Sequence, residues 1–302
     1  MISGHALVFP GMMGAVPEMP EVESLRRFLT ERCVGHAIAQ VHLAAISALK
    51  TYDPPLEALQ GGVVTGVERY GKWLAIDAGG TFLVFHLARA GWLRWRDELP
   101  TTPPRPGKGP LALRVTLDDG SGFELTEAGT QRKLAVHVVA DAAQVPAIAT
   151  LGPDPLDDDF TVAALAAILT GAGRAQLKGV LRDQRLIAGI GNAYSDEILH
   201  AARLSPFQPS NALDDEAVAA LHQVIRTELT EAIQRAEGLA AKDLKGEKKS
   251  GMRVHGRAGQ ACPVCGDTVR EVSFASSSLQ YCPTCQTGGK ALADRRMSRL
   301  LK

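Results

Sequence analysis

Apolar residues recur at helical spacing directly after two closely spaced Pro-Glu pairs. Val22, Leu25 and Leu29 fall on one face of a helix, and charged residues take the opposite face. Pro20 suits a first helical turn, where the missing N–H of proline is not needed. The pattern predicts an amphipathic helix that begins inside the segment Pro17–Glu23.

Short runs of β-branched and aromatic residues dominate the chain from residue 34 to about residue 140. Glycines separate these runs, and a loop rich in proline and glycine interrupts them at Thr101–Pro110. Their regular spacing is typical of a sandwich or a barrel. The predicted strands are Val63–Val67, Trp73–Ile76, Phe82–His86, Leu111–Leu117, Phe123–Leu125 and Leu134–Val139.

The periodicity becomes helical beyond residue 150. The segment Gly152–Pro155 cannot continue a regular element and is typical of a hinge. The segment Lys242–Arg257, rich in lysine and glycine, is expected to be mobile. The predicted helices are Thr161–Leu169, Gln176–Asp183, Ala193–Ala202 and Asp214–Ala236.

This change of pattern predicts an α+β protein with several parts. We expect a strand-rich domain with its leading helix at residues 17–150 and a helical domain at 151–245. A cysteine module is expected at 255–290 and a basic tail at 291–302. Residues 1–16 show no fold signal and are expected to be a leader that is disordered or absent from the native protein.

Charge is balanced over the whole chain but not along it. The 302 residues carry 33 Lys or Arg and 33 Asp or Glu, and no apolar run approaches the roughly eighteen residues of a membrane span. From Lys242 onward, twelve Lys or Arg face five Asp or Glu. This surplus indicates a local footprint for a polyanion on an otherwise neutral globular protein.

Four of the five cysteines form two CxxC pairs, Cys262/Cys265 and Cys282/Cys285, with sixteen residues between the pairs. Two such pairs can place four thiolates tetrahedrally around Zn²⁺ and leave no open coordination position, so the predicted site is structural. The lone Cys33 and this clustering argue against a disulfide framework. A module this small needs its metal to fold. The residues between the pairs predict a hairpin of Val272–Phe274 and Leu279–Tyr281 with its tip at 275–278.

A glycine turn at Gly189 and Gly191 leads into a helix that begins near Asn192. A nucleotide-binding loop is disfavoured, because Tyr194 stands at the third glycine position and no βαβ unit surrounds the stretch. Two interpretations remain open. The turn is a structural joint between helices, or its backbone N–H groups hold a phosphate at the helix N-terminus.

Pro17 also admits two interpretations. As part of a continuous chain it precedes a capped helix. At the start of a chain its secondary amine would be a nucleophile, because an α-amino group with a pKa of about 8 is partly neutral near pH 7. The adjacent Glu18 would then move protons.

Several polar residues in the strand region carry no specific signal alone. Lys72 sits in a strand pattern, and Arg89 and Arg132 are most simply exposed residues. His86 lies in an apolar strand, where a histidine is more often part of the core than a ligand.

Together these residues resemble the formamidopyrimidine-DNA glycosylase and endonuclease VIII family of base-excision repair enzymes. The resemblance runs from Pro17 to about Cys285. It rests on Pro17–Glu23, on Lys72, on the linker Leu151–Leu156, on Ile190–Tyr194 and on the four paired cysteines.

The resemblance implies a two-domain clamp around duplex DNA that contains damaged bases or abasic sites. An N-terminal β-sandwich with its leading helix would face a helical domain with a helix–two-turns–helix motif and a zinc hairpin. It also implies one structural Zn²⁺ ion, no membrane partner, a monomer, and a place in the bacterial cytoplasm at the nucleoid.

The resemblance implies roles for individual residues. Pro17 would attack C1′ of the damaged nucleotide, Glu18 would move protons around the sugar, and Lys72 would grip a phosphate and assist β-elimination. Further residues would bind the DNA backbone, namely Lys108, Arg174, Lys178 and Asn192, or fill the gap left by a flipped base, namely Arg89, Arg132 and Leu134.

Three departures from the family pattern bear on activity. Ser277 stands where the family usually has an arginine that assists δ-elimination. Lys242–Arg257 is shorter than the loop that closes over 8-oxoguanine, and Arg89 replaces a wedging methionine. The last two point towards oxidised pyrimidines or a broader range of lesions.

The sequence therefore predicts a DNA glycosylase with AP lyase activity. The alternative is a catalytically silent DNA-binding protein of the same fold, and a ribosomal or transcriptional zinc ribbon explains the segment at Pro17 less well. An amide nitrogen is not nucleophilic, so the working enzyme is expected to begin at Pro17, after translation from Val16 and removal of the initiator. A start at Met19 is disfavoured because it would delete Glu18.

Overall fold

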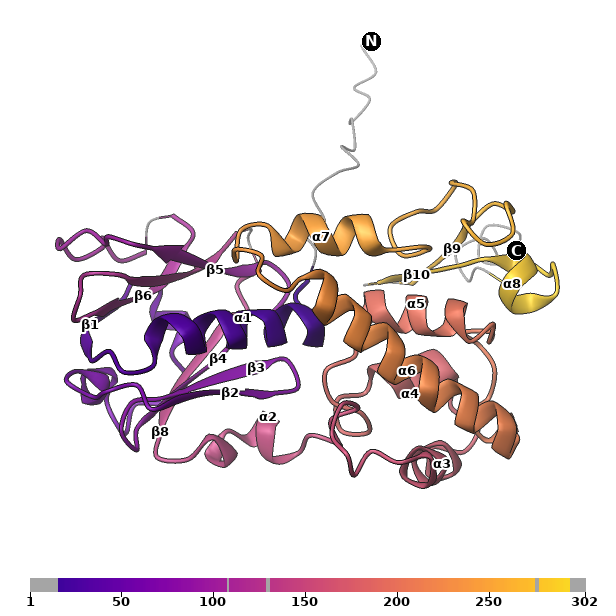
Figure 1. Cartoon of the computed structure of the whole chain (residues 1–302), viewed down its shortest axis with the longest axis horizontal. Coiled ribbons are helices and arrows are strands. Elements are labelled where there is room, and N and C mark those ends of the chain that lie inside the picture. Colours follow the sequence, from indigo (N-terminus) through magenta and orange to yellow (C-terminus); the bar gives the residue numbers. More distant parts are fainter. Residues whose placement is uncertain (1–15, 108, 129–130, 275–276, 294–302) are drawn as a thin grey trace, which may run out of the picture.

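Two antiparallel sheets and a leading helix make up the N-terminal half of the protein (Figure 1). The computed structural model describes residues 16–107, 109–128, 131–274 and 277–293. Helix α1 spans Met19–Cys33. One sheet has the order β1-β6-β7-β5, with strands Ile38–Leu43, Leu111–Leu117, Gly122–Glu127 and Gly91–Arg96. The other has the order β2-β3-β4-β8, with strands Gly66–Tyr70, Trp73–Asp77, Phe82–His86 and Ala135–Val139.

The alternation of apolar residues decides how the second sheet is buried. In β3, Leu74 and Ile76 point into the core that the sheets share with α1. Ala75 between them points the other way, into a smaller core covered by α2 at Pro146–Ala149. The N-terminal half is therefore a β-sandwich with a covered outer face, as the family resemblance implied.

Helices form the C-terminal half, around a second core (Figure 1). They are α3 (Val162–Gly171), α4 (Leu177–Arg182), α5 (Asn192–Ala201) and α6 (Asp215–Arg235). The side chains of Thr161 and Asp214 accept backbone N–H groups in the first turns of α3 and α6, which fixes where these helices begin. Short 3₁₀ turns lie at Ile46–Ala48, Leu56–Leu59, Ala142–Gln144 and Ser210–Ala212.

Met19 joins the two halves of the molecule. It is the first residue of α1, yet its fully buried side chain belongs to the core of the helical half. Its backbone N–H donates to the carbonyl oxygen of Gly189 over 3.0 Å. The segment at Pro17 is thereby held where the two halves meet.

A hairpin follows the helices, between the two pairs of cysteines. Strands β9 (Arg270–Ser273) and β10 (Ser278–Tyr281) pair antiparallel, and the short helix α8 (Pro283–Thr287) comes next. The hairpin prediction is confirmed, although residues 275–276 of its tip lie outside the described residues.

Two predictions about elements are wrong. The strand predicted at Val63–Val67 begins only at Gly66, because Val63 makes just an isolated bridge to Ala37. The segment Lys242–Arg257, expected to be mobile, contains helix α7 at Leu244–Gly251. Its sequence includes two glycines and lacks an apolar stripe, and the helix is held by the buried Leu244 and Lys248.

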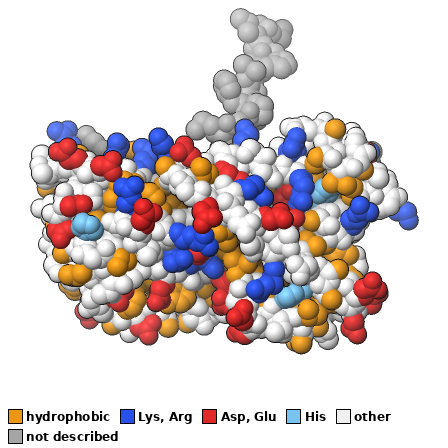
Figure 2. All heavy atoms as spheres, in the orientation of Figure 1, with side chains coloured by type: hydrophobic (Ala, Val, Ile, Leu, Met, Phe, Trp, Pro, Cys, Tyr) orange, Lys and Arg blue, Asp and Glu red, His pale blue; other side chains and the backbone are white. Residues whose placement is uncertain are grey.

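Positive and negative side chains are mixed on the face that carries α1 and α6 (Figure 2). Neither sign forms a large uniform patch on this face. Within the described ranges, no helix combines the length and the apolar character of a membrane span.

Candidate active site

The carboxylate of Glu18 is held at the N-terminus of α5. Its oxygens accept the backbone N–H groups of Gly191 at 2.7 Å, Ala193 at 2.8 Å and Tyr194 at 3.2 Å. A helix N-terminus stabilises an anion through such groups and through its dipole. The turn therefore does bind an anion, but the anion is Glu18 and not the phosphate considered from the sequence.

Both glycines of this turn are needed for the close approach of α1. A Cβ on Gly191 would lie 2.3 Å from Cδ of Glu18, and one on Gly189 would lie 2.3 Å from Cε of Met19. Gly189 also has φ +88°, a conformation that favours glycine. The spacing of the two glycines is thus explained by contact with residues 18 and 19.

Glu18 is ionised at neutral pH. Its burial alone would raise the pKa, but Lys248, Lys72 and the N–H of Ala193 lower the pKa to about 2. A carboxylate with such a low pKa stays ionised near pH 7 and accepts hydrogen bonds. Pro17, buried beside it, therefore lies next to a fixed negative charge.

Lys72 approaches Glu18 from the sandwich, on the other side from the start of α5. It lies in the tight turn between β2 and β3, and not within a strand as predicted. A Cβ on the preceding Gly71 would lie 3.2 Å from the backbone nitrogen of Gly189, so this turn touches the turn before α5. Burial lowers the pKa of the Lys72 ammonium, whereas the charge of Glu18 opposes that change.

Lys248 completes a buried cluster of charges that the sequence did not reveal. Its Nζ donates to Oε2 of Glu21 over 2.8 Å and to the carbonyl oxygen of Val16 over 2.9 Å, and lies 3.7 Å from Oε1 of Glu18. The Tyr194 hydroxyl donates to the other oxygen of Glu21 over 2.8 Å. Lys248 is one of several lysines in a basic segment, so no sequence signal distinguished it.

Glu21 also caps α1. Its side chain accepts the backbone N–H of Glu18 over 2.8 Å and completes a capping box. Burial raises the pKa of Glu21, and the neighbouring Lys248 ammonium opposes the rise. The Glu21 carboxylate therefore caps the start of α1 and also binds Lys248 in the buried cluster.

Lys178 is buried and engaged within the protein. Its Nζ donates to the carbonyl oxygen of Asn192 at 3.1 Å, to Ser195 Oγ at 2.8 Å and to Asp196 Oδ1 at 2.6 Å. Asp196 in turn accepts from Nδ1 of His255 over 2.8 Å. These contacts use all three ammonium protons, so this conformation does not favour the predicted contact of Lys178 with a DNA phosphate.

Asn192 connects α5 to the hairpin. Its Nδ2 donates to the carbonyl oxygen of Ser278 over 2.8 Å. Its Oδ1 is buried without a hydrogen-bond partner among the described residues. The bond to Ser278 uses one of the two Nδ2 protons, so the contact of Asn192 with DNA stays a prediction.

The remaining predicted residues fall into two groups. Arg89, Arg132 and Arg174 are exposed and able to meet DNA, whereas Lys108 lies outside the described residues. Leu134 is buried in the sandwich core at 2% exposure, so this conformation does not favour the prediction that it fills a gap in DNA.

His86 is half-buried and lies beside the core, not within it. It packs on Trp73 with ring centroids 4.8 Å apart, and its Nδ1 accepts the backbone N–H of Ala88 over 3.1 Å. Burial and the nearby Lys72 lower its pKa to about 4. The ring is therefore neutral and structural.

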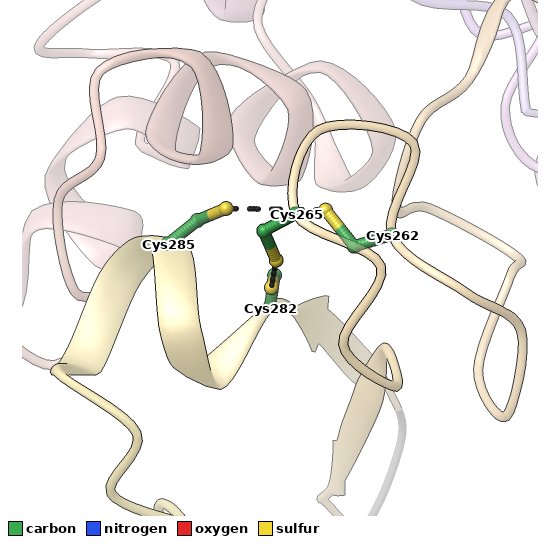
Figure 3. Close-up of side chains that lie close together, drawn as sticks. All are labelled: Cys262, Cys265, Cys282 and Cys285. Atoms are coloured by element: carbon green, nitrogen blue, oxygen red, sulfur yellow. Dashed lines mark hydrogen bonds between the residues drawn. The ribbon is translucent and has the colours of Figure 1, made fainter.

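The four paired cysteines meet at one point between a loop and the start of α8 (Figure 3). Their sulfur atoms lie within 4.8 Å of one another, with 3.9 Å between Cys262 and Cys285 and 3.3 Å between Cys265 and Cys282. Tetrahedral Zn–S bonds of about 2.3 Å require sulfur–sulfur distances of about 3.8 Å. The residues fit a structural Zn²⁺ ion, which confirms the cofactor prediction.

His200 on α5 also contacts this site. Its Nε2 lies 3.3 Å from Sγ of Cys262, at hydrogen-bond distance. A partner of this kind orients a metal ligand from outside the coordination sphere. The sequence gave no signal for it, because residues 200 and 262 meet only in the folded chain.

Three family models match consecutive parts of the chain. The N-terminal domain of formamidopyrimidine-DNA glycosylase matches residues 16–135, and the H2TH domain of formamidopyrimidine-DNA glycosylase matches residues 151–243. The zinc finger found in FPG and IleRS matches residues 259–288.

Individual proteins agree with these matches. A formamidopyrimidine-DNA glycosylase of Symbiobacterium thermophilum is 36% identical over 292 residues, which cover 93% of each chain. An uncharacterized formamidopyrimidine-DNA glycosylase-like protein of Mycobacterium tuberculosis is 58% identical over 160 residues, or 53% of this chain and 99% of that protein.

The fold has close counterparts among solved structures. The glycosylase of Lactococcus lactis, bound non-covalently to DNA that contains an AP site, superposes with a TM-score of 0.77. It is 26% identical in sequence, and the match covers 89% of this chain and 99% of that one. The chain belongs to the formamidopyrimidine-DNA glycosylase family.

Proposed function

We propose that this protein excises oxidised bases from duplex DNA and cleaves the resulting abasic site through a Schiff base on Pro17. The observation that carries the proposal is the junction at residues 17 and 18. Pro17 is buried where the two halves meet, beside an ionised Glu18 that three backbone N–H groups hold in place.

The chemistry requires a free amine at Pro17. A secondary amine attacks C1′ and displaces the base, and Glu18 as a carboxylate can take the proton that the nitrogen loses. The positive charge of Lys72 acts on the Glu18 carboxylate, so Lys72 is close to the site and can bind a phosphate of the damaged nucleotide. We therefore propose that the active form begins at Pro17.

DNA contacts are assigned to residues that the structure leaves accessible. Arg89, Arg132 and Arg174 are all exposed. We propose that Arg174 binds the DNA backbone. We propose that Arg89 and Arg132 enter the gap that a flipped base leaves in the duplex. Lys108 is proposed for the backbone from the sequence alone. Relatives crystallised with abasic-site DNA support duplex DNA as the partner.

The preferred lesion follows from the departures noted in the sequence. The segment between α6 and the hairpin holds the short helix α7, whose Lys248 packs on Glu21. We propose that this leaves no long loop to close over a flipped 8-oxoguanine, and that oxidised pyrimidines or a broader set of lesions are excised. Ser277 in place of arginine predicts that cleavage stops mainly at β-elimination.

Borohydride trapping tests the proposal. The chain that begins at Pro17 is expected to form a covalent adduct with abasic and oxidised-base duplexes and to leave β-elimination ends. The intact 302-residue chain and Pro17→Ala in the intact chain are the comparison, since neither has an amine at position 17. An intact chain that traps DNA as fast as the Pro17 form would show that another amine is the nucleophile.

A silent DNA-binding protein of the same fold is the alternative. It would bind abasic duplexes in both forms and trap neither. The relative from Mycobacterium tuberculosis, 58% identical over 160 residues, is itself uncharacterized, so the test includes this alternative.

A further inference from the structure

One face of α5 is turned towards the module that holds the paired cysteines. Asn192, Asp196 and His200 are four residues apart, so successive turns of the helix present them to the same side. Asn192 and Asp196 bind backbone groups of β10, and His200, one turn further along, reaches Cys262. Helix α5 accordingly lies beside β10 and α8 (Figure 1).

The imidazole of His200 is buried and makes one hydrogen-bonding contact. The residue is 3% exposed, and its Nε2 lies 3.3 Å from Sγ of Cys262, which is 2% exposed. Nδ1 is buried without a partner among the described residues. In the same part of the chain, the four sulfur atoms form no hydrogen bond to any other side chain, apart from those to one another.

The chemistry of a zinc site decides the direction of this bond. A cysteine that ligates Zn²⁺ is a thiolate, which accepts a hydrogen bond and has no proton to donate. A neutral imidazole carries one proton, and only a proton on Nε2 can reach the sulfur. A proton on Nδ1 would have no acceptor among the described residues and would leave a lone pair against the thiolate.

We propose that His200 is a positioning residue of the zinc site, which donates its Nε2–H to the Cys262 thiolate. The bond withdraws negative charge from a site where four thiolates surround one divalent cation, and it restricts rotation of the Cys262 side chain. Because His200 belongs to α5, it ties the metal site to the helix whose first turn holds Glu18. The inference concerns the metal site and is independent of whether the protein cleaves DNA.

Zinc affinity of the full chain, measured by competition with a chromogenic chelator, tests the proposal. His200→Phe keeps an aromatic ring and removes the N–H donor. Loss of an outer partner of this kind is expected to raise the dissociation constant for Zn²⁺ about 10- to 100-fold. An unchanged dissociation constant would overturn the proposal.

His222→Phe is the matched control. His222 lies on α6 in the helical half, stacks on Phe160 and forms its hydrogen bond with the carbonyl oxygen of that residue, not with a sulfur atom. The variant loses a histidine hydrogen bond of the same half without touching the metal site. Its zinc affinity is expected to match that of the parent, and a loss equal to that of His200→Phe would assign the effect to general destabilisation and overturn the proposal.

Cobalt(II) in place of zinc separates the hydrogen bond from packing. A donor stabilises the lone pairs of a thiolate, so its removal is expected to move the thiolate-to-cobalt charge-transfer band to lower energy. The same band position in His200→Phe and in the parent would show that the ring only fills space and would overturn the proposal.

A second pair of variants remains informative if His200→Phe fails to fold. The side chains in His200→Gln and His200→Met are of similar length, but glutamine has an N–H donor and methionine has none. His200→Gln is expected to bind zinc at least about 10-fold more tightly than His200→Met and to recover the charge-transfer band of the parent. Equal affinities and equal bands in the two variants would overturn the role of the N–H group.

Discussion

Single residues of this site differ in how far their neighbours in sequence determine their role. Glu18 and Glu21 lie three residues apart at a helix start, which is a capping pattern, and both are engaged there. Lys178 and Lys248 carry the same side chain as many exposed lysines, yet both are buried. Their burial depends on Asp196 and Glu21, which are distant in sequence, so local patterns could not reveal it.

The low pKa of Glu18 predicts how stability responds to acid. A carboxyl group whose pKa is lowered on folding, here from 4.5 to about 2, contributes stability that is complete above pH 4.5. That contribution is lost as the pH falls from 4.5 towards 2, and amounts to about 3 kcal/mol. Amide hydrogen exchange at Gly191, Ala193 and Tyr194 is expected to accelerate in this window.

Glu18→Gln provides the control for this prediction. The amide does not titrate, so the acceleration specific to this pH window is expected to disappear in the variant. Acceleration of equal size in both proteins would assign the acid sensitivity to other carboxyl groups.

At the scale of elements, the sequence predicted what depends on local periodicity. The strands at Phe82–His86 and Leu111–Leu117 have the predicted bounds, and the four-cysteine hairpin follows from ligand spacing. Helix α7 was missed because its glycines and lysines disfavour a helix when judged alone. Its contacts with α1 and α6 stabilise it, which is information that only the tertiary structure contains.

Loss of zinc is expected to act through the hairpin and α5. Cys282→Ser removes one of four thiolates, so the protein should lose its zinc and the hairpin should unfold. The bond from Asn192 to Ser278 would break with it. Zinc content by atomic absorption, and affinity for an abasic duplex, are both expected to fall.

The sandwich is the internal reference for this experiment. Its core contains no hairpin residue, so near-ultraviolet signals from Trp92 and Trp95 should persist in Cys282→Ser. Full DNA affinity in a zinc-free protein would contradict the assigned role of the hairpin.

At the scale of the whole molecule, the site exists only because the halves meet. Pro17 and Glu18 precede a helix of the sandwich domain, yet Met19 packs into the helical core and Glu18 binds the start of α5. The sequence located both domains and both motifs separately. The resemblance to a known family, and not periodicity, placed them against one another.

Salt dependence tests which cations of this assembled molecule face DNA. Each phosphate contact contributes a slope of about −0.9 to the dependence of log affinity on log salt concentration. Arg174 is exposed, so Arg174→Ala is expected to reduce the magnitude of the slope by about 0.9. Lys178 has its protons engaged by Asn192, Ser195 and Asp196, so Lys178→Met should leave the slope unchanged.

Lys178→Met is expected to act on stability instead. Removing one partner of a buried ion pair leaves Asp196 buried without its cation, at a cost of about 3–5 kcal/mol, so thermal unfolding should occur at a clearly lower temperature. Fluorescence anisotropy over a salt series and a thermal melt separate the two effects. A slope that falls in Lys178→Met would mean that DNA binding withdraws this ammonium group from Asp196, and the buried network of the free protein would then be a resting state of a DNA contact.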